Sequence, residues 1–224
     1  MTAQKRTERI KMVCSMAMLT AIAIAADLLL RIPDIGGILT YEPKDVILTI
    51  GAFIFGPVHG IVMSFVVCFI EMITISTTGI WGFIMNFLAS GVFVGIASVI
   101  YIRKKTLSSA IIGLVSSSFS MVIVMLLWNY IITPIYMGVP RDVVLGLFLP
   151  LLIPFNFLKT ALNSALVMLL YKGIVTTLRK SKLIPTRESN DNENFKTNTI
   201  ILICLSAFIV ATLTLVMLIF AGII

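Results

Sequence analysis

The sequence contains few charged residues, a single histidine and only three cysteines. Charged side chains make up 12% of its 224 residues, whereas a typical soluble domain has about a quarter. A disordered chain is excluded, because disorder requires low hydrophobicity and high charge. A soluble globular domain is excluded, because so few polar side chains cannot cover a chain that is 59% hydrophobic. The composition therefore indicates an integral helical membrane protein.

The motifs that mark common enzymes are also missing. No Gly-rich loop precedes Lys-Ser or Lys-Thr, so the chain cannot by itself bind ATP through a P-loop. Cys14, Cys68 and Cys204 lie far apart in apolar segments, and no Cys, His or Asp cluster has metal-ligand spacing. The single His59 lies beside a Gly-Pro turn, where a solvated or interfacial role is the ordinary one. We therefore expect no enzymatic activity, no metal and no cofactor.

Apolar runs separated by polar breaks predict an all-α fold. We expect a six-helix transmembrane bundle in residues 12–182, preceded by a cytoplasmic segment, 1–11. A polar linker, 183–198, and an additional C-terminal transmembrane helix, 199–224, follow. A span needs roughly 20 apolar residues. The apolar runs of the bundle cover 12–30, 46–55, 58–75, 81–101, 107–132 and 155–170.

The run 46–55 is too short to cross the bilayer alone, because a helix rises about 1.5 Å per residue. Gly56-Pro57 follows it and favours a turn. We interpret 46–75 as a helical hairpin, with one long kinked helix as the alternative. Residues 133–142 contain two prolines and a glycine and are expected to form a loop.

The formal net charge of +7 has a topological explanation. Nucleic-acid binding would need a basic face in polar surroundings, whereas these basic residues lie between apolar spans. Cytoplasmic loops are enriched in Lys and Arg, and a cytoplasmic N-terminus with the hairpin formed places most of them inside. The inside set is Lys5, Arg6, Arg9, Lys11, Arg103, Lys104, Lys105, Lys172, Arg179, Lys180, Lys182, Arg187 and Lys196. Arg31, Lys44 and Arg141 fall outside, and Lys159 lies within a span. We predict a multi-pass protein of the cell membrane, in contact with lipid and not with nucleic acid.

Polar residues within the apolar runs identify a candidate site, because such groups usually face a protein interior or a cavity. Asn156 and Lys159 are three residues apart and share a helix face. A snorkelling lysine beside a helix-capping asparagine is the alternative. Asn129 is a second candidate. Asn86 can simply bond a neighbouring helix, and Glu71 requires either the outer interface or a basic partner.

These residues gather at the outer ends of the helices, on the same side as the loops 39–45 and 77–79. A site there would be an outward-facing pocket with apolar and aromatic walls, a few amides and one cation. Such a pocket suits a neutral, flat ring molecule with hydrogen-bonding edges, because a phosphate or a dicarboxylate would require several cations.

The first span carries Ala17, Ala21 and Ala25 at intervals of four residues. Small residues at this spacing allow another helix to pack closely. The stripe predicts either a packing face within the protein or a docking face for a partner membrane protein.

The chain resembles the substrate-binding S components of energy-coupling factor (ECF) vitamin transporters, most closely the riboflavin-specific members. The resemblance covers about residues 10–180 and rests on the order and spacing of short motifs. They are the alanine stripe, Tyr41-Glu42-Pro43-Lys44-Asp45, Gly51-Ala52-Phe53-Ile54-Phe55-Gly56-Pro57-x2-Gly60, Ser76-Thr77-Thr78-Gly79, Asn86-Phe87, Tyr101-x-Arg103-Lys104-Lys105, Asn129-Tyr130 with Pro134 and Tyr136, and Pro154-Phe155-Asn156-x2-Lys159. Glu71 and the C-terminal apolar run depart from the family's pattern.

The resemblance implies a subunit that binds riboflavin from outside and works with a transmembrane coupling subunit and two cytoplasmic ATPases. It implies that Asn129, Asn156 and Lys159 hold the ring system, while the first outer loop closes over the ligand. The alanine stripe would contact the coupling subunit. The expected substrate-binding residues are Thr40, Tyr41, Glu42, Thr77, Thr78, Asn86, Asn129, Asn156 and Lys159. An S component for another small vitamin or precursor, and a membrane scaffold without a ligand, are the alternative functions.

Overall fold

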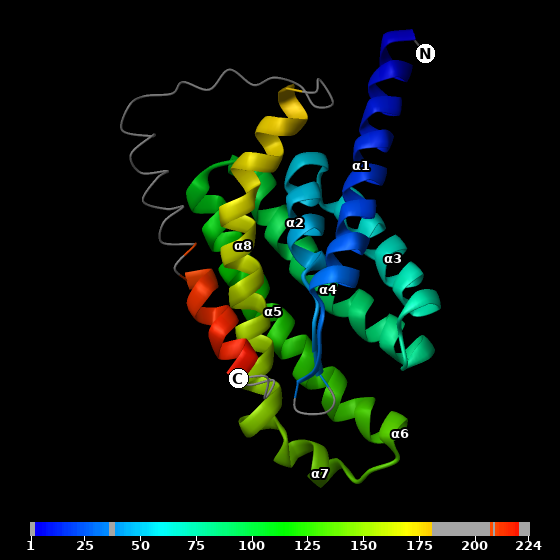
Figure 1. The fold of residues 1–224 in the computed structure, drawn as a ribbon, viewed down its shortest axis with the longest axis vertical. Helices are drawn as coiled ribbons and strands as arrows, with labels where there is room; N and C mark the ends of the chain where they lie inside the picture. The colour runs from blue at the N-terminus through cyan, green and yellow to red at the C-terminus, as the bar shows by residue number, and fades with distance from the viewer. Residues whose placement is uncertain (1–2, 36–38, 181–206, 208, 220–224) are drawn as a thin grey trace.

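The computed structural model describes residues 3–35, 39–180, 207 and 209–219. Among them, five helices are long and apolar enough to cross a membrane, and they form a bundle (Figure 1). They are α1 (Ala3–Leu30), α3 (Pro57–Thr74), α4 (Gly79–Lys104), α5 (Leu107–Ile131) and α8 (Ile153–Lys180). The shorter α2 (Lys44–Phe55) packs against α1, α3, α4 and α8. The six helices together confirm the predicted fold class.

Helix α2 is enclosed by the other helices of the bundle. Every residue from Lys44 to Phe53 is buried. Ile50 and Phe53 pack in one apolar cluster with Phe93 of α4 and Leu114 of α5. Because protein rather than lipid covers most of this helix, it does not need the length of a membrane span.

The turn between α2 and α3 confirms the predicted helical hairpin. Gly56 has φ +100° and ψ 165°, a conformation that residues with a side chain rarely adopt. Pro57 begins α3, where its missing N–H has no helical partner to lose. The helices approach so closely that a Cβ on Gly60 would lie 2.4 Å from the Cβ of Ala52. Helix α3 runs back from the end of α2 (Figure 1), which excludes the single kinked helix.

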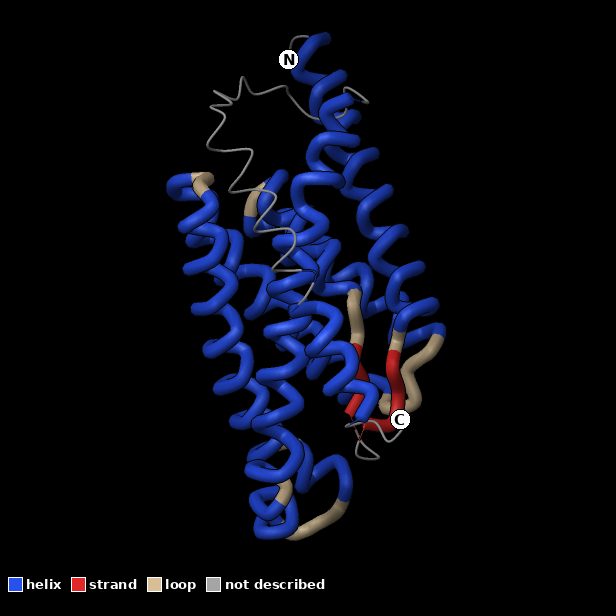
Figure 2. The backbone as a smooth tube through the Cα atoms, turned by 60° about the vertical axis from the view of Figure 1, so that its left-hand side comes forward, coloured by secondary structure: helices blue, strands red, loops and turns tan. Residues whose placement is uncertain are grey.

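The segment between α1 and α2 is a β-hairpin at one end of the bundle (Figure 2). Strand β1 (Ile32–Ile35) pairs antiparallel with β2 (Leu39–Tyr41). A two-stranded hairpin is marginally stable by itself, so its position depends on the helices against which it packs. Leu39 and Tyr41 supply that contact by packing in a cluster with Phe155 of α8.

The region predicted to be a loop, 133–142, forms short helices instead. They are α6 (Thr133–Met137) and α7 (Arg141–Gly146), followed by the π-helix η1 (Phe148–Leu152). Pro134 lies in the first turn of α6, Gly138 ends that helix with φ +66°, and Pro140 caps the start of α7. The loop prediction is wrong because prolines in a first helical turn and glycines after a last turn begin and end helices as readily as they break them.

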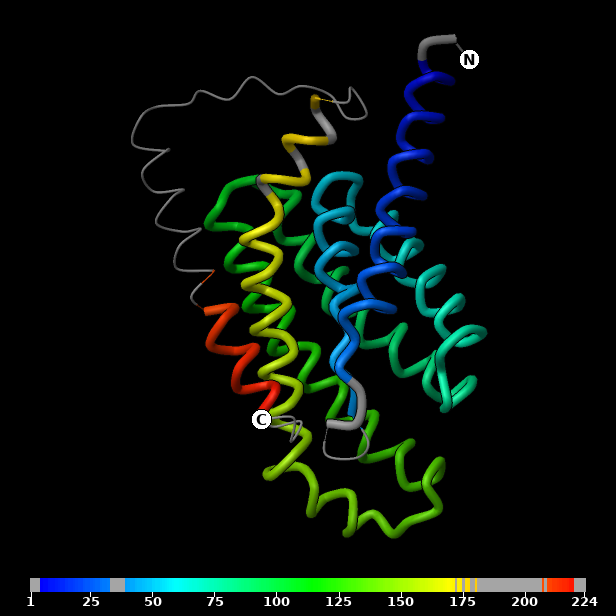
Figure 3. The backbone as a smooth tube through the Cα atoms, viewed as in Figure 1, coloured from blue at the N-terminus to red at the C-terminus, as the bar shows by residue number. Residues whose placement is uncertain are grey.

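The two ends of the bundle differ in composition. The N-terminus of α1, the end of α4 and the end of α8 lie at one end, and the β-hairpin, α6 and α7 lie at the other (Figures 1 and 3). Arg103 and Lys104 are exposed at the end of α4. The basic residues predicted to be cytoplasmic therefore gather at the end away from the β-hairpin, as far as the structure describes them.

The alanine stripe lies on the outer face of α1. Ala17, Ala21 and Ala25 are exposed, whereas Leu19 and Ala23 are buried against the bundle. Within the described residues, the stripe is therefore not an internal packing face.

The described helices extend beyond the apolar runs at both ends of the predicted bundle. Helix α1 already begins at Ala3, and α8 continues to Lys180. The predicted linker, 183–198, lies outside the described residues. Of the C-terminal run, 199–224, the structure describes an apolar helix over Ile209–Ile219.

Candidate substrate-binding site

A cavity of about 350 Å³ lies between the β-hairpin, the α3–α4 loop and helices α4, α5, α6 and α8. Its polar lining comes from all of these elements and consists of Arg31, Thr40, Glu42, Ser76, Thr77, Thr78, Asn86, Asn129, Thr133, Asn156 and Lys159. Its larger apolar and aromatic side chains are Leu39, Trp81, Met85, Met121, Met125, Trp128, Ile132, Tyr136, Met137 and Phe155. Pockets for small molecules typically have volumes of roughly 300–1,000 Å³, apolar walls and a few fixed polar groups. The cavity has these properties.

The residues singled out from the sequence converge on this cavity. Every expected substrate-binding residue except Tyr41 lines it. Tyr41 is buried behind the wall, and its hydroxyl donates a hydrogen bond to Oδ1 of Asn163 (2.9 Å). The structure thus gives Tyr41 the role of joining β2 to α8 rather than a place in the cavity.

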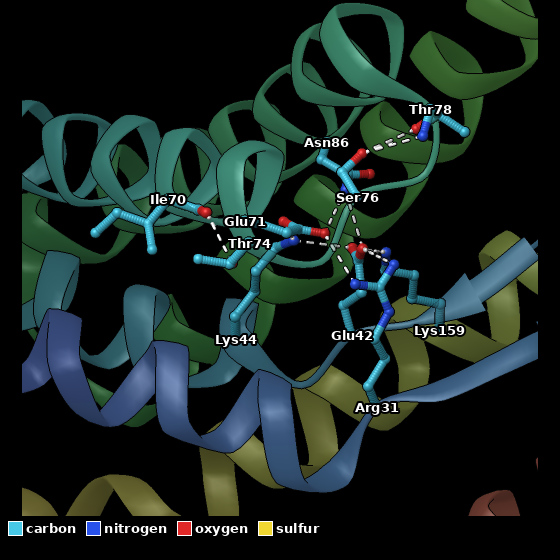
Figure 4. Close-up of polar contacts among 10 residues, drawn as sticks. All are labelled: Arg31, Glu42, Lys44, Ile70, Glu71, Thr74, Ser76, Thr78, Asn86 and Lys159. Atoms are coloured by element: carbon cyan, nitrogen blue, oxygen red, sulfur yellow. Dashed lines mark hydrogen bonds and ion pairs between the residues drawn. The ribbon is translucent and has the colours of Figure 1, made fainter.

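Glu42 lies at the centre of a buried network of ion pairs (Figure 4). Its Oε2 accepts a hydrogen bond from Nζ of Lys159 (3.2 Å) and forms an ion pair with Nζ of Lys44 (3.1 Å). Lys44 also donates to Glu71. Lys44 is 0% exposed and Glu42 is 3% exposed. Charges buried to this degree require partners, because an uncompensated buried charge is strongly destabilising.

Asn86 and Arg31 connect Glu42 with Glu71. The Nδ2 group of Asn86 donates to Oε1 of Glu42 (2.9 Å) and to Oε1 of Glu71 (2.8 Å). Both of its N–H groups are therefore used. The guanidinium of Arg31 forms ion pairs with the same two oxygens, at 3.8 Å from Glu42 and 3.5 Å from Glu71. The basic partners that Glu71 requires are thus Lys44 and Arg31.

The surrounding cations keep the carboxyl group of Glu42 ionised. Burial alone would raise its pKa, but the ammonium groups of Lys44 and Lys159 outweigh burial and hold the pKa of Glu42 well below its usual range. An ionised carboxylate has about four lone-pair sites and only accepts hydrogen bonds. Glu42 therefore holds the Lys159 ammonium in place, while Lys44, Asn86 and Arg31 contact its remaining acceptor positions.

Asn129 on α5 and Asn156 on α8 each bond to the backbone of the preceding helical turn, which for Asn156 lies in η1. Each Nδ2 donates to the carbonyl oxygen four residues earlier, Met125 and Leu152 respectively, at 2.7 Å. Asn156 therefore donates to a backbone carbonyl instead of accepting from a backbone N–H as a helix-capping residue would. Lys159 is only 5% exposed, so its side chain does not snorkel to the membrane interface. Each amide keeps a second N–H for another partner.

Arg31 and Lys44 are the site residues that the sequence analysis missed, because it placed both in outer loops. Arg31 lines the cavity, and Lys44 is buried in the first turn of α2. The available signal was Glu71, since a carboxylate in an apolar run needs a cation nearby. Among the described residues, the cavity wall has two cations, Arg31 and Lys159, instead of the single cation expected. No group of three or more His, Cys, Asp or Glu residues suited to a metal ion occurs in the described part of the chain.

A six-helix membrane bundle with a cavity of apolar walls and convergent polar groups is the architecture of a substrate-binding membrane protein. The chain belongs to the family described as "ECF transporter, substrate-specific component", whose model matches residues 11–171. Its structure is similar to one solved as "Structure and mechanism of the S component of a bacterial ECF transporter", with a TM-score of 0.65 and 31% identity. That match covers 76% of this chain and 99% of the other chain.

The chain is also similar to a transporter whose substrate is named. The riboflavin transporter RibU of Staphylococcus aureus (strain TCH60) is 30% identical over 177 residues, which cover 76% of this chain and 93% of the relative. S components bind a vitamin and work with a transmembrane coupling subunit and ATPases, so the chain is a transport component and not an enzyme. Its apolar helices make it a multi-pass membrane protein.

Proposed function

We propose that this chain is the riboflavin-binding S component of an ECF transporter. The observation that carries the proposal is the convergence of Asn129, Asn156 and Lys159, from two helices, on one cavity with apolar walls. The pyrimidine edge of a flavin alternates hydrogen-bond donors and acceptors, and an amide supplies one of each. The name of the Staphylococcus aureus relative supports the same ligand.

The two sides of the cavity suit the two parts of riboflavin. Met121, Met125 and Trp128 give the isoalloxazine ring an apolar wall on α5. Lys159 has three N–H donors and uses one on Glu42, so it can donate to a ring carbonyl or nitrogen. On the β-hairpin side, the hydroxyl of Thr40 and the backbone of Glu42 are suited to the ribityl hydroxyls, and Thr77 and Thr78 are suited to them from the loop between α3 and α4.

The charges of the cavity wall favour a neutral ligand. Arg31 is paired with Glu42 and Glu71, and Lys159 is paired with Glu42. No cation of the wall is therefore left without a carboxylate among the described residues. A phosphate or a second carboxylate would have to compete for these cations, whereas riboflavin needs only hydrogen bonds.

Binding to the purified protein tests the proposal directly. Riboflavin should bind in detergent without ATP, and quenching of flavin fluorescence should report it. Raising the riboflavin concentration should raise the melting temperature in proportion to binding. Thiamine and biotin serve as controls. A higher melting temperature with one of them and not with riboflavin would assign another vitamin to the cavity. An unchanged melting temperature with every vitamin would favour a membrane scaffold without a ligand.

We infer that the exposed alanine stripe is the docking face for the coupling subunit. Its outward position on α1 supports this reading, because small side chains let a partner helix approach closely. Ala21→Trp should leave riboflavin binding intact and abolish uptake in cells that contain the partner subunits. Ile22→Trp is the matched control, since Ile22 is exposed on a different side of the same helix. Equal uptake by both variants would contradict the docking role.

We also propose a cytoplasmic N-terminus, with the cavity facing outward. The gathering of exposed basic residues at the end away from the β-hairpin supports this orientation. In intact cells, an impermeant thiol reagent should label Thr77→Cys and not Lys104→Cys, and riboflavin should protect Thr77→Cys. The opposite labelling pattern would invert the topology.

A further inference from the structure

The C-terminal helix lies beyond the part of the chain that the family shares. The family model ends at residue 171, whereas this helix covers Ile209–Ile219. It lies beside α8 (Figure 3). The described helix is shorter than the roughly 20 residues of a span.

One face of this helix is buried against the bundle. Met217 is 0% exposed, and Val210 and Leu213 are partly buried in the same apolar cluster. Positions 210, 213 and 217 share one side of a helix. Leu215 and Val216, on other sides of the helix, are exposed. The contact is therefore specific to one face.

The cluster that receives this face also forms the cavity wall. It contains Tyr41 of β2 with Phe155 and Leu162 of α8, and Leu39 of β2 packs against it. Leu39 and Phe155 line the cavity as well. The hydroxyl of Tyr41 bonds to Asn163 of α8 (2.9 Å), so β2 and α8 are joined at the same place. The C-terminal helix thus covers the seam between the β-hairpin and α8, behind the cavity.

We propose that the C-terminal helix clamps the β-hairpin against α8 and thereby slows the release of the ligand. This inference rests on the proposed function, because it concerns the exchange of riboflavin at the same cavity. A bound ligand leaves only when elements of the wall separate. A two-stranded hairpin has little stability of its own, so apolar contacts behind it determine how readily it moves. Separating β2 from α8 would expose the cluster around Met217 to lipid or water.

The rate of riboflavin dissociation from the full-length protein tests the clamp. The recovery of flavin fluorescence after rapid dilution should be about tenfold faster for Met217→Ala than for the wild type, because most differences in affinity between related complexes lie in the dissociation rate. Val216→Ala is the matched control, an exposed neighbour on the same helix, and should leave the rate unchanged. The association rate should change little in both.

Leu213→Ala and Val210→Ala extend the test to milder truncations of the same face, and either replaces Met217→Ala if that variant does not fold. Faster dissociation with an unchanged circular dichroism spectrum supports the clamp. Dissociation as slow as in Val216→Ala, even with a lower melting temperature, overturns it. If the wild-type protein does not bind riboflavin at all, the proposed function fails instead.

Discussion

Both ends of the bundle carry basic residues, but these residues are buried at the cavity end and exposed at the other end. At the cavity end, Lys44 and Lys159 are buried, and both contact Glu42. At the other end, Arg103 and Lys104 are exposed. An exposed cation keeps its hydration and gains little from a partner, whereas a buried cation depends on one. The basic residues therefore divide into a topological set and a site set, and burial separates the two.

Among these predictions, the largest expected effect is the loss of stability on replacing Lys44. Lys44→Ala removes the more deeply buried of the two cations that Glu42 and Glu71 share, and breaking a buried pair lowers the free energy of unfolding by about 3–5 kcal/mol. The melting temperature in detergent, followed by circular dichroism, should fall accordingly. The double variant Lys44→Met, Glu71→Met should recover part of the loss, because both partners of the pair are replaced by apolar groups. A double variant no more stable than Lys44→Ala would contradict the pairing.

Truncating the amide and ammonium groups of the cavity should weaken binding by an intermediate amount. Lys159→Ala and Asn156→Ala should each weaken riboflavin binding by about 1–3 kcal/mol, the penalty for leaving a buried polar group unsatisfied. Fluorescence titration measures the dissociation constants. Thr176→Ala, an exposed position on the same helix, is the control. If both variants bind as tightly as this control, the ligand does not occupy the cavity as proposed.

Neutralising Glu71 should change selectivity more than affinity. Glu71→Gln removes one carboxylate partner from Arg31 and from Lys44. Flavin mononucleotide, which carries a phosphate, should gain about five- to tenfold relative to riboflavin, the order expected for one charge at an intermediate dielectric constant. Competition titrations with the two flavins give the ratio. An unchanged ratio would show that Glu71 does not control the charge available to the ligand.

The smallest effects should come from the exposed basic end. Lys104→Ala and Arg103→Ala should leave both the melting temperature and the dissociation constant of riboflavin unchanged, because surface substitutions rarely matter to either. The same titration and the same melting experiment measure them. Weaker riboflavin binding in either variant would remove the distinction between the two ends.

Much of the fold follows from local sequence. The apolar run 107–132 corresponds to α5, which covers Leu107–Ile131, and Gly56-Pro57 forms the turn that its residues favour. The prediction for 133–142 is wrong, because the same prolines and glycine can break a chain or cap a helix, and only the surrounding packing decides between these outcomes.

Most of the polar residues that line the cavity were predicted from the sequence, but Arg31 and the contacts between these residues were not. Polar residues in apolar runs must face a cavity or a partner, so Asn129, Asn156 and Lys159 could be identified without a structure. The sequence alone could not exclude Tyr41 from the cavity lining, because its hydroxyl donates to Asn163, which lies 122 positions further along the chain.

The sequence by itself determined that this is a helical membrane protein, which segments are apolar, and which polar residues need a partner. These properties depend on composition and on spacing along the chain. Only the tertiary structure decided that Lys44 pairs with Glu71, 27 residues away, and that Lys159 pairs with Glu42, 117 residues away. Electrostatic pairing depends on distance in space and on burial. Lys44, which the sequence analysis assigned to an outer loop, is therefore the most deeply buried cation of the site.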